Sequence, residues 1–198
     1  MDSRNITGFL EFLRKAENLK NTIRTARTSN GRDESSAEHT WRLCLMLIAL
    51  EQDLAPLDMT RLLKMAIIHD LAEAECGDIP AVDAGGAGDK SAAERRGIME
   101  LTASLSEERR AAILSLWEEY EGAASAEAAF LKGLDKLETI LQHNQGENPD
   151  GFDYEFNLLY GKRYTEAHPL LSAIRERADQ QTRERARAAR TRRDDAAT

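Results

Sequence analysis

The segment MAIIHDLAEAECGDIP, residues 65–80, decides how this chain is interpreted. It opens with an apolar run from Met65 that has the spacing of a buried helix. His69 and Asp70 then stand side by side where that apolar pattern should continue, and Glu73 follows one turn later. Burying ionisable groups costs several kcal/mol unless they are paired or bind a cation. The segment therefore predicts that a helix gives up core packing at this point to build a metal site.

The composition is that of an ordinary soluble protein. The chain has 198 residues, of which 41% are hydrophobic and 31% charged, so we expect one domain or one compact domain with a tail. No apolar run approaches the ~20 residues that span a bilayer, and the N-terminal segment lacks the apolar core of a signal peptide. Cys44 and Cys76 make no ligand-type pair, which indicates free thiols in a reducing cytosol. We expect a cytoplasmic protein without a membrane partner.

The charge is unevenly distributed along the chain. The net charge is −8, but the arginine-rich residues 175–198 carry +3, which leaves −11 on residues 1–174. We expect residues 1–174 to form the domain and residues 175–198 to be a helical extension or a disordered tail. Such a tail could bind nucleic acid, but it has no interleaved aromatic residues and the acidic domain would repel phosphates. We therefore expect no nucleic-acid partner.

Apolar residues recur at helical spacing along almost the whole chain, which predicts an all-α bundle. Ser35 and Glu38 have the spacing of a capping box at the start of the helix that carries His39. Asp58 is expected to cap the next helix, which should run through Leu71 or a little beyond. Neither an alternating segment nor a hairpin turn stands out. Further helices are expected at 6–19, 92–105, 107–121 and 125–142, and after residue 168.

Four ionisable residues interrupt or border the apolar stripes of these helices: His39, His69, Asp70 and Asp135. Each alone has an ordinary explanation, such as a helix cap or a salt bridge at the edge of the core. Burying all four without a cation would be costly, and a shared divalent ion removes that cost. Two imidazoles and two carboxylates form a mixed N/O donor set that suits zinc, manganese, iron or cobalt. The sequence therefore predicts a divalent metal site.

The order of these four residues resembles the metal signature of the HD-domain phosphohydrolases. Further motifs resemble the HD-domain 5′-deoxynucleotidase family and cover roughly residues 10–174: IRT, SAEHTWR, IIHDLAEAECGDIP, LWEEYE, SAEAAFLKGLDKLE and HPLL. This resemblance implies a bundle of about six or more helices, usually a homodimer. It also implies hydrolysis of deoxyribonucleoside 5′-monophosphates to deoxyribonucleoside and phosphate.

The resemblance assigns roles to single residues as well. The four residues match the ligands of one divalent cation, for which Co, Mn, Zn, Fe and Mg are candidates. Glu73 matches the carboxylate that orients or deprotonates the attacking water, and Asp78 matches a second acid that positions substrate. In some members these two acids and the carbonyl at the position of Ile79 hold a second cation. Arg24 matches a substrate-contacting arginine, and Thr25 stands where relatives often have tryptophan, so we expect altered sugar or base selection.

Two alternatives fit the same residues. A hydrolase of deoxynucleoside triphosphates or of guanosine tetraphosphate would need more positive charge for the extra phosphates, and Arg24, Arg27 and Arg32 could supply some of it. A non-catalytic, metal-stabilised nucleotide-binding module is the other alternative. The presence of Glu73 and Asp78 argues against that module, because a protein that only binds nucleotides needs no general base.

Overall fold

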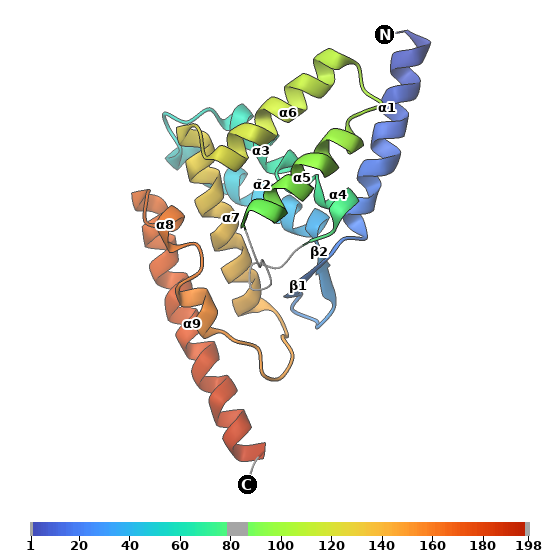
Figure 1. Cartoon of the computed structure of the whole chain (residues 1–198). Helices are drawn as coiled ribbons and strands as arrows, with labels where there is room; N and C mark the ends of the chain where they lie inside the picture. Colours follow the sequence, from blue (N-terminus) through green and yellow to red (C-terminus); the bar gives the residue numbers. More distant parts are fainter. Residues whose placement is uncertain (1, 79–86, 197–198) are drawn as a thin grey trace. The chain divides into compact units, whose positions relative to one another are not determined.

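The computed structural model describes residues 2–78 and 87–196 and confirms the predicted all-α fold (Figure 1). The chain divides into two compact units. The first consists of residues 1–25 and 34–128, and the second of residues 26–33 and 129–198. None of the helices in the described part of the chain is long and apolar enough to cross a membrane.

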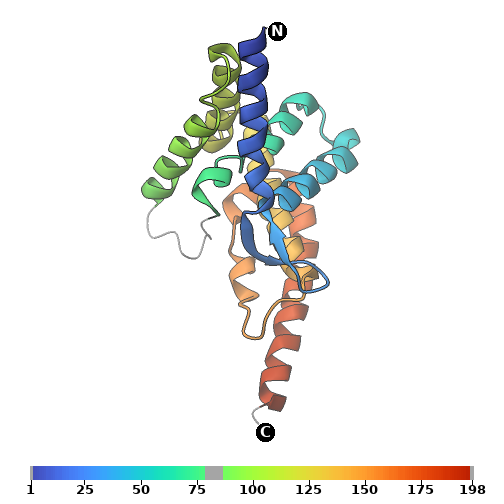
Figure 2. The same cartoon turned by 90° about the vertical axis from the view of Figure 1, so that its right-hand side faces the viewer.

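The first unit contains six α-helices within its described residues. They are α1 (Ser3–Ala16), α2 (Ser36–Leu50), α3 (Met59–Ile68), α4 (Glu73–Cys76), α5 (Ala87–Leu101) and α6 (Glu107–Gly122), with 3-10 turns η1 (Glu17–Lys20) and η2 (Glu51–Asp53). Helix α3 packs on α2 and α6, α4 packs on α5 and η1, and α1 lies beside α5 (Figure 2). The core between them is apolar: Leu19, Ile68, Leu71, Ala72, Ala74, Ile98, Leu101 and Trp117. This packing holds the end of α3 and all of α4 against the start of α2.

The second unit is built around most of α7 (Ala126–Gln145), followed by η3 (Glu155–Leu158), α8 (Lys162–Thr165) and α9 (Pro169–Ala196). Helix α9 packs on η3 and α8. Arg175 in α9 is buried; its guanidinium donates to Asp179 Oδ1 at 2.6 Å and to the carbonyl oxygens of Asn157 and Tyr160, both at 2.7 Å. Helix α9 continues to Ala196, and Arg175, the first arginine of the predicted tail, has a structural role in the described residues. The domain boundary at residue 174 stays a prediction.

The arginine-rich connection after η1 is a β-hairpin, so the expectation of no hairpin was wrong. Strand β1 (Ile23–Arg27) pairs with β2 (Asp33–Ser35). The turn contains Asn30 and Gly31, and Gly31 has φ = +82°, a value that side chains with a Cβ rarely adopt. An Asn-Gly pair is a typical hairpin signal. The strands have only five and three residues, which is too short for an alternating pattern to become visible.

The predicted starts of α2 and α3 are confirmed, whereas the predicted end of α3 was wrong. Ser35 Oγ accepts from the Glu38 amide at 3.3 Å while Glu38 Oε2 accepts from the Ser35 amide at 2.9 Å, which completes the capping box. Asp58 caps α3 as expected. Helix α3 ends at Ile68, and the next turn is tighter, with the Leu71 amide bonded to the Ile68 carbonyl. Apolar spacing continues through this turn because both residues pack in the core, so the sequence pattern alone does not reveal the helix end.

Candidate metal centre

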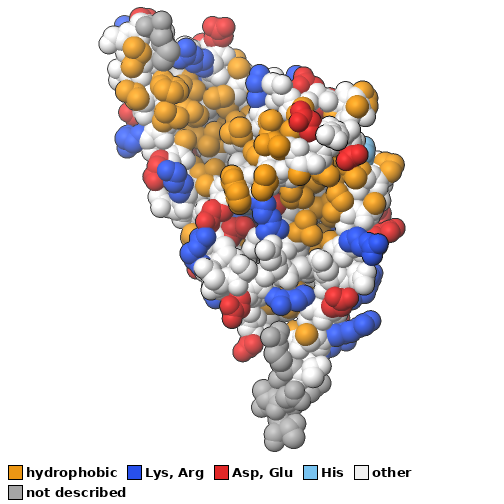
Figure 3. Space-filling view, turned by 180° about the vertical axis from the view of Figure 1, so that it is seen from behind, with side chains coloured by type: hydrophobic (Ala, Val, Ile, Leu, Met, Phe, Trp, Pro, Cys, Tyr) orange, Lys and Arg blue, Asp and Glu red, His pale blue; other side chains and the backbone are white. Residues whose placement is uncertain are grey.

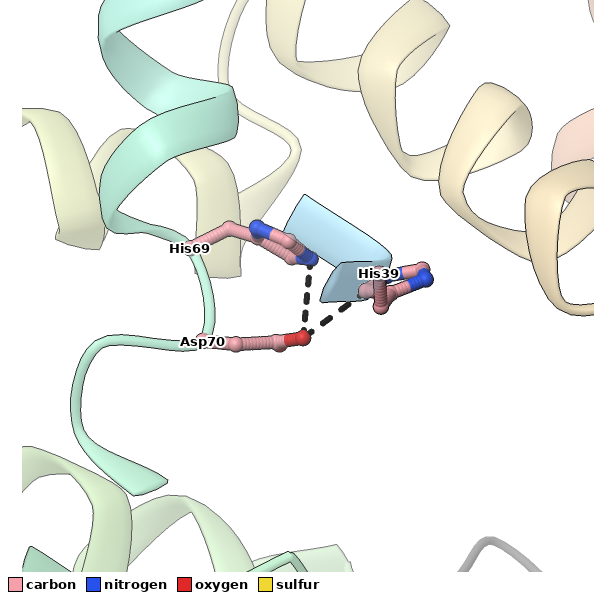
Figure 4. Close-up of side chains that lie close together, drawn as sticks. All are labelled: His39, His69 and Asp70. Carbon is pink, nitrogen blue, oxygen red and sulfur yellow. Dashed lines mark ion pairs between the residues drawn. The ribbon is translucent and has the colours of Figure 1, made fainter. Parts of the chain in front are cut away.

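The structure brings three of the predicted ligands together. His39 lies in the first turn of α2, His69 follows the last residue of α3, and Asp70 comes next in the tight turn. One ligand atom from each lies within 4.8 Å of the others. Asp70 Oδ2 is 3.1 Å from His69 Nε2 and 3.7 Å from His39 Nε2, and Figure 4 shows both imidazoles turned towards this carboxylate. Both histidines are buried, so the group is set into the protein rather than displayed on its surface.

The donor set fits a divalent cation. His69 Nδ1 lies 2.8 Å from the carbonyl oxygen of Ala66, which can only accept, so Nδ1 carries a proton and Nε2 is the nitrogen that faces Asp70. His69 Nε2 and Asp70 Oδ2 are buried, and neither has a hydrogen-bond partner among the described residues. Burying polar atoms without a hydrogen bond is costly, and a cation between two nitrogens and a carboxylate removes the cost. His39, His69 and Asp70 would hold such an ion.

Asp70 is held in its charged form. Burial alone would raise its pKa, but the neighbouring His69, His39 and Arg24 keep the pKa of Asp70 well below its usual range. Arg24 lies on β1, with Nη1 3.6 Å from Asp70 Oδ2 and Nε 3.5 Å from Glu34 Oε2. Glu34, which is buried on β2, was not predicted to take part in the site. The predicted substrate-contacting arginine is thus fixed between two acids beside the metal ligands.

Glu73 is buried at the start of α4, in the same unit. The hydroxyl of Ser36 donates to Glu73 Oε2 at 2.7 Å. Burial, together with the negative charges of Asp70 and Asp78, raises the pKa of Glu73 to about 9. Asp78 is half-buried just after α4 and acts on Glu73 through its charge. The structure thus places Glu73 close enough to Asp70, and Asp78 close enough to Glu73, for their charges to interact.

Asp135, the fourth predicted ligand, belongs to the second unit. It is buried in α7, where it accepts from Lys136 Nζ at 2.8 Å. Burial would lower the pKa of Lys136, but Asp135 and the hydroxyl of Tyr160 raise it well above its usual range. The part of Asp135 in metal binding stays a prediction. Thr25 is exposed on β1, and Ile79 lies outside the described residues.

Sequence reasoning missed Glu34 and Ser36. They flank Ser35, and in the sequence they look like ordinary members of a helix-capping segment. A local capping pattern does not show which distant group a neighbouring hydroxyl or carboxylate will contact. The second of two consecutive serines was the available signal, because one serine is enough to form the capping box.

The metal-free protein is expected to lose stability as pH rises. A carboxyl whose pKa is raised from about 4.5 to about 9 on folding favours the protonated native state. The contribution of Glu73 to the free energy of unfolding is complete below pH 4.5 and is lost as pH rises through 9. Between pH 6 and 9 the free energy of unfolding of the wild type should fall by roughly 2–4 kcal/mol relative to Glu73→Gln. Urea unfolding with a chelator present measures both proteins, and parallel pH curves would contradict the assignment.

Comparison with known proteins places this geometry in a family. The HD-domain family model matches residues 16–175, so the chain belongs to the HD-domain family. Its curated relatives include the 5′-deoxynucleotidase HDDC2 of Homo sapiens, which is 36% identical over 70% of this chain and 68% of the relative. The 5′-deoxynucleotidase HDDC2 of Dictyostelium discoideum is 32% identical over 85% of this chain and 95% of the relative.

Solved structures agree on the fold. The chain is similar to the structure of a predicted metal-dependent phosphohydrolase from Magnetospirillum magnetotacticum MS-1, with a TM-score of 0.74 and 24% identity over 93% of this chain and 97% of that one. It is also similar to a protein from Pyrococcus horikoshii OT3, with a TM-score of 0.59 and 27% identity over 84% and 98% of the two chains. The helical arrangement around the His-Asp turn is therefore the HD-domain fold.

Proposed function

We propose that this chain is a divalent-metal-dependent 5′-deoxynucleotidase that hydrolyses deoxyribonucleoside 5′-monophosphates to deoxyribonucleoside and phosphate. The observation that carries the proposal is the buried group of His39, His69 and Asp70, with Arg24 paired to Asp70. A phosphomonoester dianion is repelled by an acidic protein, and a cation beside an arginine overcomes that repulsion. The names of the relatives in two eukaryotes support the choice of substrate.

Asp135 is our proposed fourth ligand of the cation. The family resemblance supports it, and Asp135 is buried in α7. Two imidazoles and two carboxylates are compatible with Co, Mn, Zn, Fe or Mg. When bound, the metal would polarise a phosphoryl oxygen and lower the pKa of water towards neutrality.

Glu73 is our proposed general base, and Asp78 the acid that helps to position the substrate. In the metal-free protein the raised pKa keeps Glu73 protonated at neutral pH. Added positive charge nearby favours the carboxylate, so a bound cation would restore the form that accepts a proton from water. Glu73 and Asp78 could also hold a second cation with the carbonyl of Ile79, and that role rests on the family resemblance alone.

Arg24 is our proposed phosphate contact. Its guanidinium lies between Asp70 and Glu34, beside the predicted metal ligands. A planar guanidinium binds phosphate oxygens through paired donors. Thr25 follows on β1 with an exposed side chain. Threonine is smaller than tryptophan, so it offers less apolar surface to a base or sugar. We therefore propose a sugar or base preference that differs from relatives with tryptophan at this position.

We also propose that the protein is a cytoplasmic homodimer without a nucleic-acid partner. The family resemblance implies the dimer, and exposed apolar residues support it. They lie on α1 and α2: Ile6, Phe9, Leu10, Leu13, Trp41, Leu45 and Ile48. Figure 3 shows hydrophobic side chains gathered over a broad area of one face. Large exposed apolar areas mark interaction surfaces, and a second copy of this chain is the occupant that the resemblance favours.

Phosphate release from a nucleotide panel tests the proposed function. The protein is stripped of metal, reloaded with Co²⁺, Mn²⁺, Zn²⁺ or Mg²⁺, and given deoxy- and ribonucleoside mono-, di- and triphosphates. We expect metal-dependent release from the deoxymonophosphates. Activity confined to triphosphates would favour the triphosphate hydrolase, and nucleotide binding without any release would favour the non-catalytic module.

A further inference from the structure

Ser36 is placed differently from an ordinary helix-capping residue. The amino end of α2 is already satisfied by the reciprocal bonds of Ser35 and Glu38. Ser36, the next residue, is fully buried, and its hydroxyl points away from the cap to Glu73 Oε2, 2.7 Å away and 37 residues later in the chain. A buried hydroxyl that contacts a buried carboxylate from a distant helix fixes the rotation of that carboxylate.

The contact also ties the proposed base to a metal ligand. Ser36 and His39 are three residues apart on α2, so they lie on the same side of the helix. Glu73 begins α4, and the chain reaches it from His69 and Asp70 through the tight turn that follows α3. The bond from Ser36 therefore sets the Glu73 carboxylate relative to the helix that holds His39.

A second hydroxyl holds the other end of the same residue. Thr22 Oγ1 lies 3.2 Å from the carbonyl oxygen of Glu73, and the Thr22 carbonyl accepts from the Ser36 amide at 2.9 Å. Thr22 is buried as well. Glu73 is thus bonded to one hydroxyl through its side chain and to another through its main chain. The bond from Ser36 orients the carboxylate of Glu73, and the bond from Thr22 anchors its backbone.

We infer that Ser36 is a positioning residue that orients the carboxylate of Glu73 for proton abstraction from the attacking water. The inference rests on the proposed function. By occupying Oε2, the hydroxyl leaves Oε1 as the oxygen that accepts the proton. Small misplacements of a reacting group can cost as much as about 10²-fold in rate, so an orienting bond affects turnover more than substrate binding.

Steady-state kinetics of three metal-loaded variants tests the inference, with a deoxyribonucleoside 5′-monophosphate as substrate. Ser36→Ala should lower kcat by about 10-fold or more while KM stays within about twofold of wild type. Ser36→Cys keeps the shape with a weaker donor and should fall between serine and alanine. Thr102→Val is the matched control, because it removes a fully buried hydroxyl of the same unit that donates to the Ile98 carbonyl of α5, and it should leave kcat within about twofold. Metal content, measured by elemental analysis, should equal that of wild type in all three.

The possible outcomes are distinguishable. Equal losses of kcat in Ser36→Ala and Thr102→Val would mean that the loss of any buried hydroxyl in this unit slows the reaction, and the inference would be wrong. A rise in KM alone, or loss of metal from Ser36→Ala, would also overturn it while leaving the proposed function intact. A metal-loaded wild type that releases no phosphate from any nucleotide would overturn the proposed function, and the inference with it.

Discussion

Replacing Asp70 with alanine is expected to lower metal-dependent phosphate release by at least about 10³-fold. Asp70 Oδ2 is 3.1 Å from His69 Nε2, 3.7 Å from His39 Nε2 and 3.6 Å from Arg24 Nη1, so it joins the ligand group to the proposed phosphate contact. A cation contributes several kcal/mol of charge stabilisation in phosphoryl transfer, and that contribution is lost with the ligand. The variant should also bind less metal per chain than wild type.

Asp53→Ala is the matched control for this substitution. Asp53 is an exposed acid in η2 of the same unit, so the variant removes the same charge far from the ligand group in sequence. It should retain wild-type turnover and metal content. Full activity in Asp70→Ala, with circular dichroism showing a folded protein, would exclude Asp70 from the reaction.

Glu73→Gln is expected to lower kcat by about 10²–10⁴-fold with the metal retained. Glutamine has the shape of glutamate, and its side-chain oxygen still accepts from the Ser36 hydroxyl, but the amide takes no proton from water. The loss should therefore fall on kcat rather than on KM. Steady-state kinetics and metal analysis of the same preparation measure both quantities.

Glu75→Gln provides the control on the same short helix. Glu75 is exposed and lies two residues further along α4, on another side of the helix. Its substitution removes one negative charge without touching the buried carboxylate. Unchanged turnover is expected there. A Glu73→Gln protein that turns over like wild type would show that another group takes the proton.

Several parts of the fold follow from local sequence signals. The capping box of Ser35 and Glu38 and the cap at Asp58 were predicted because each depends on residues within three positions of one another. The hairpin at Asn30 was missed because its strands are too short to show alternation. The end of α3 at Ile68 was missed because no glycine or proline marks it, and Ile68 and Leu71 on either side of it both pack in the core.

The residues of the candidate site likewise fall into those that the sequence predicts and those that it does not. The order of His39, His69 and Asp70 on successive helices was visible in the sequence, and the structure brings them within 4.8 Å. The contacts of Ser36 and Glu34 were not visible, because both join residues that are distant in sequence or lie on a strand that was not expected. Ligand types and spacing thus identify a metal site, whereas the groups that orient its neighbours depend on tertiary packing.

Anomalous X-ray scattering from crystals of the Mn²⁺- or Co²⁺-loaded protein tests the central claim most directly. The account predicts one strong peak about 2.0–2.2 Å from nitrogen or oxygen atoms of His39, His69 and Asp70. A carboxylate oxygen of Asp135 at the same distance would complete the proposed ligand set. A peak coordinated by other residues, or a loaded crystal with no peak among these three side chains, would contradict the metal centre and the reaction built on it.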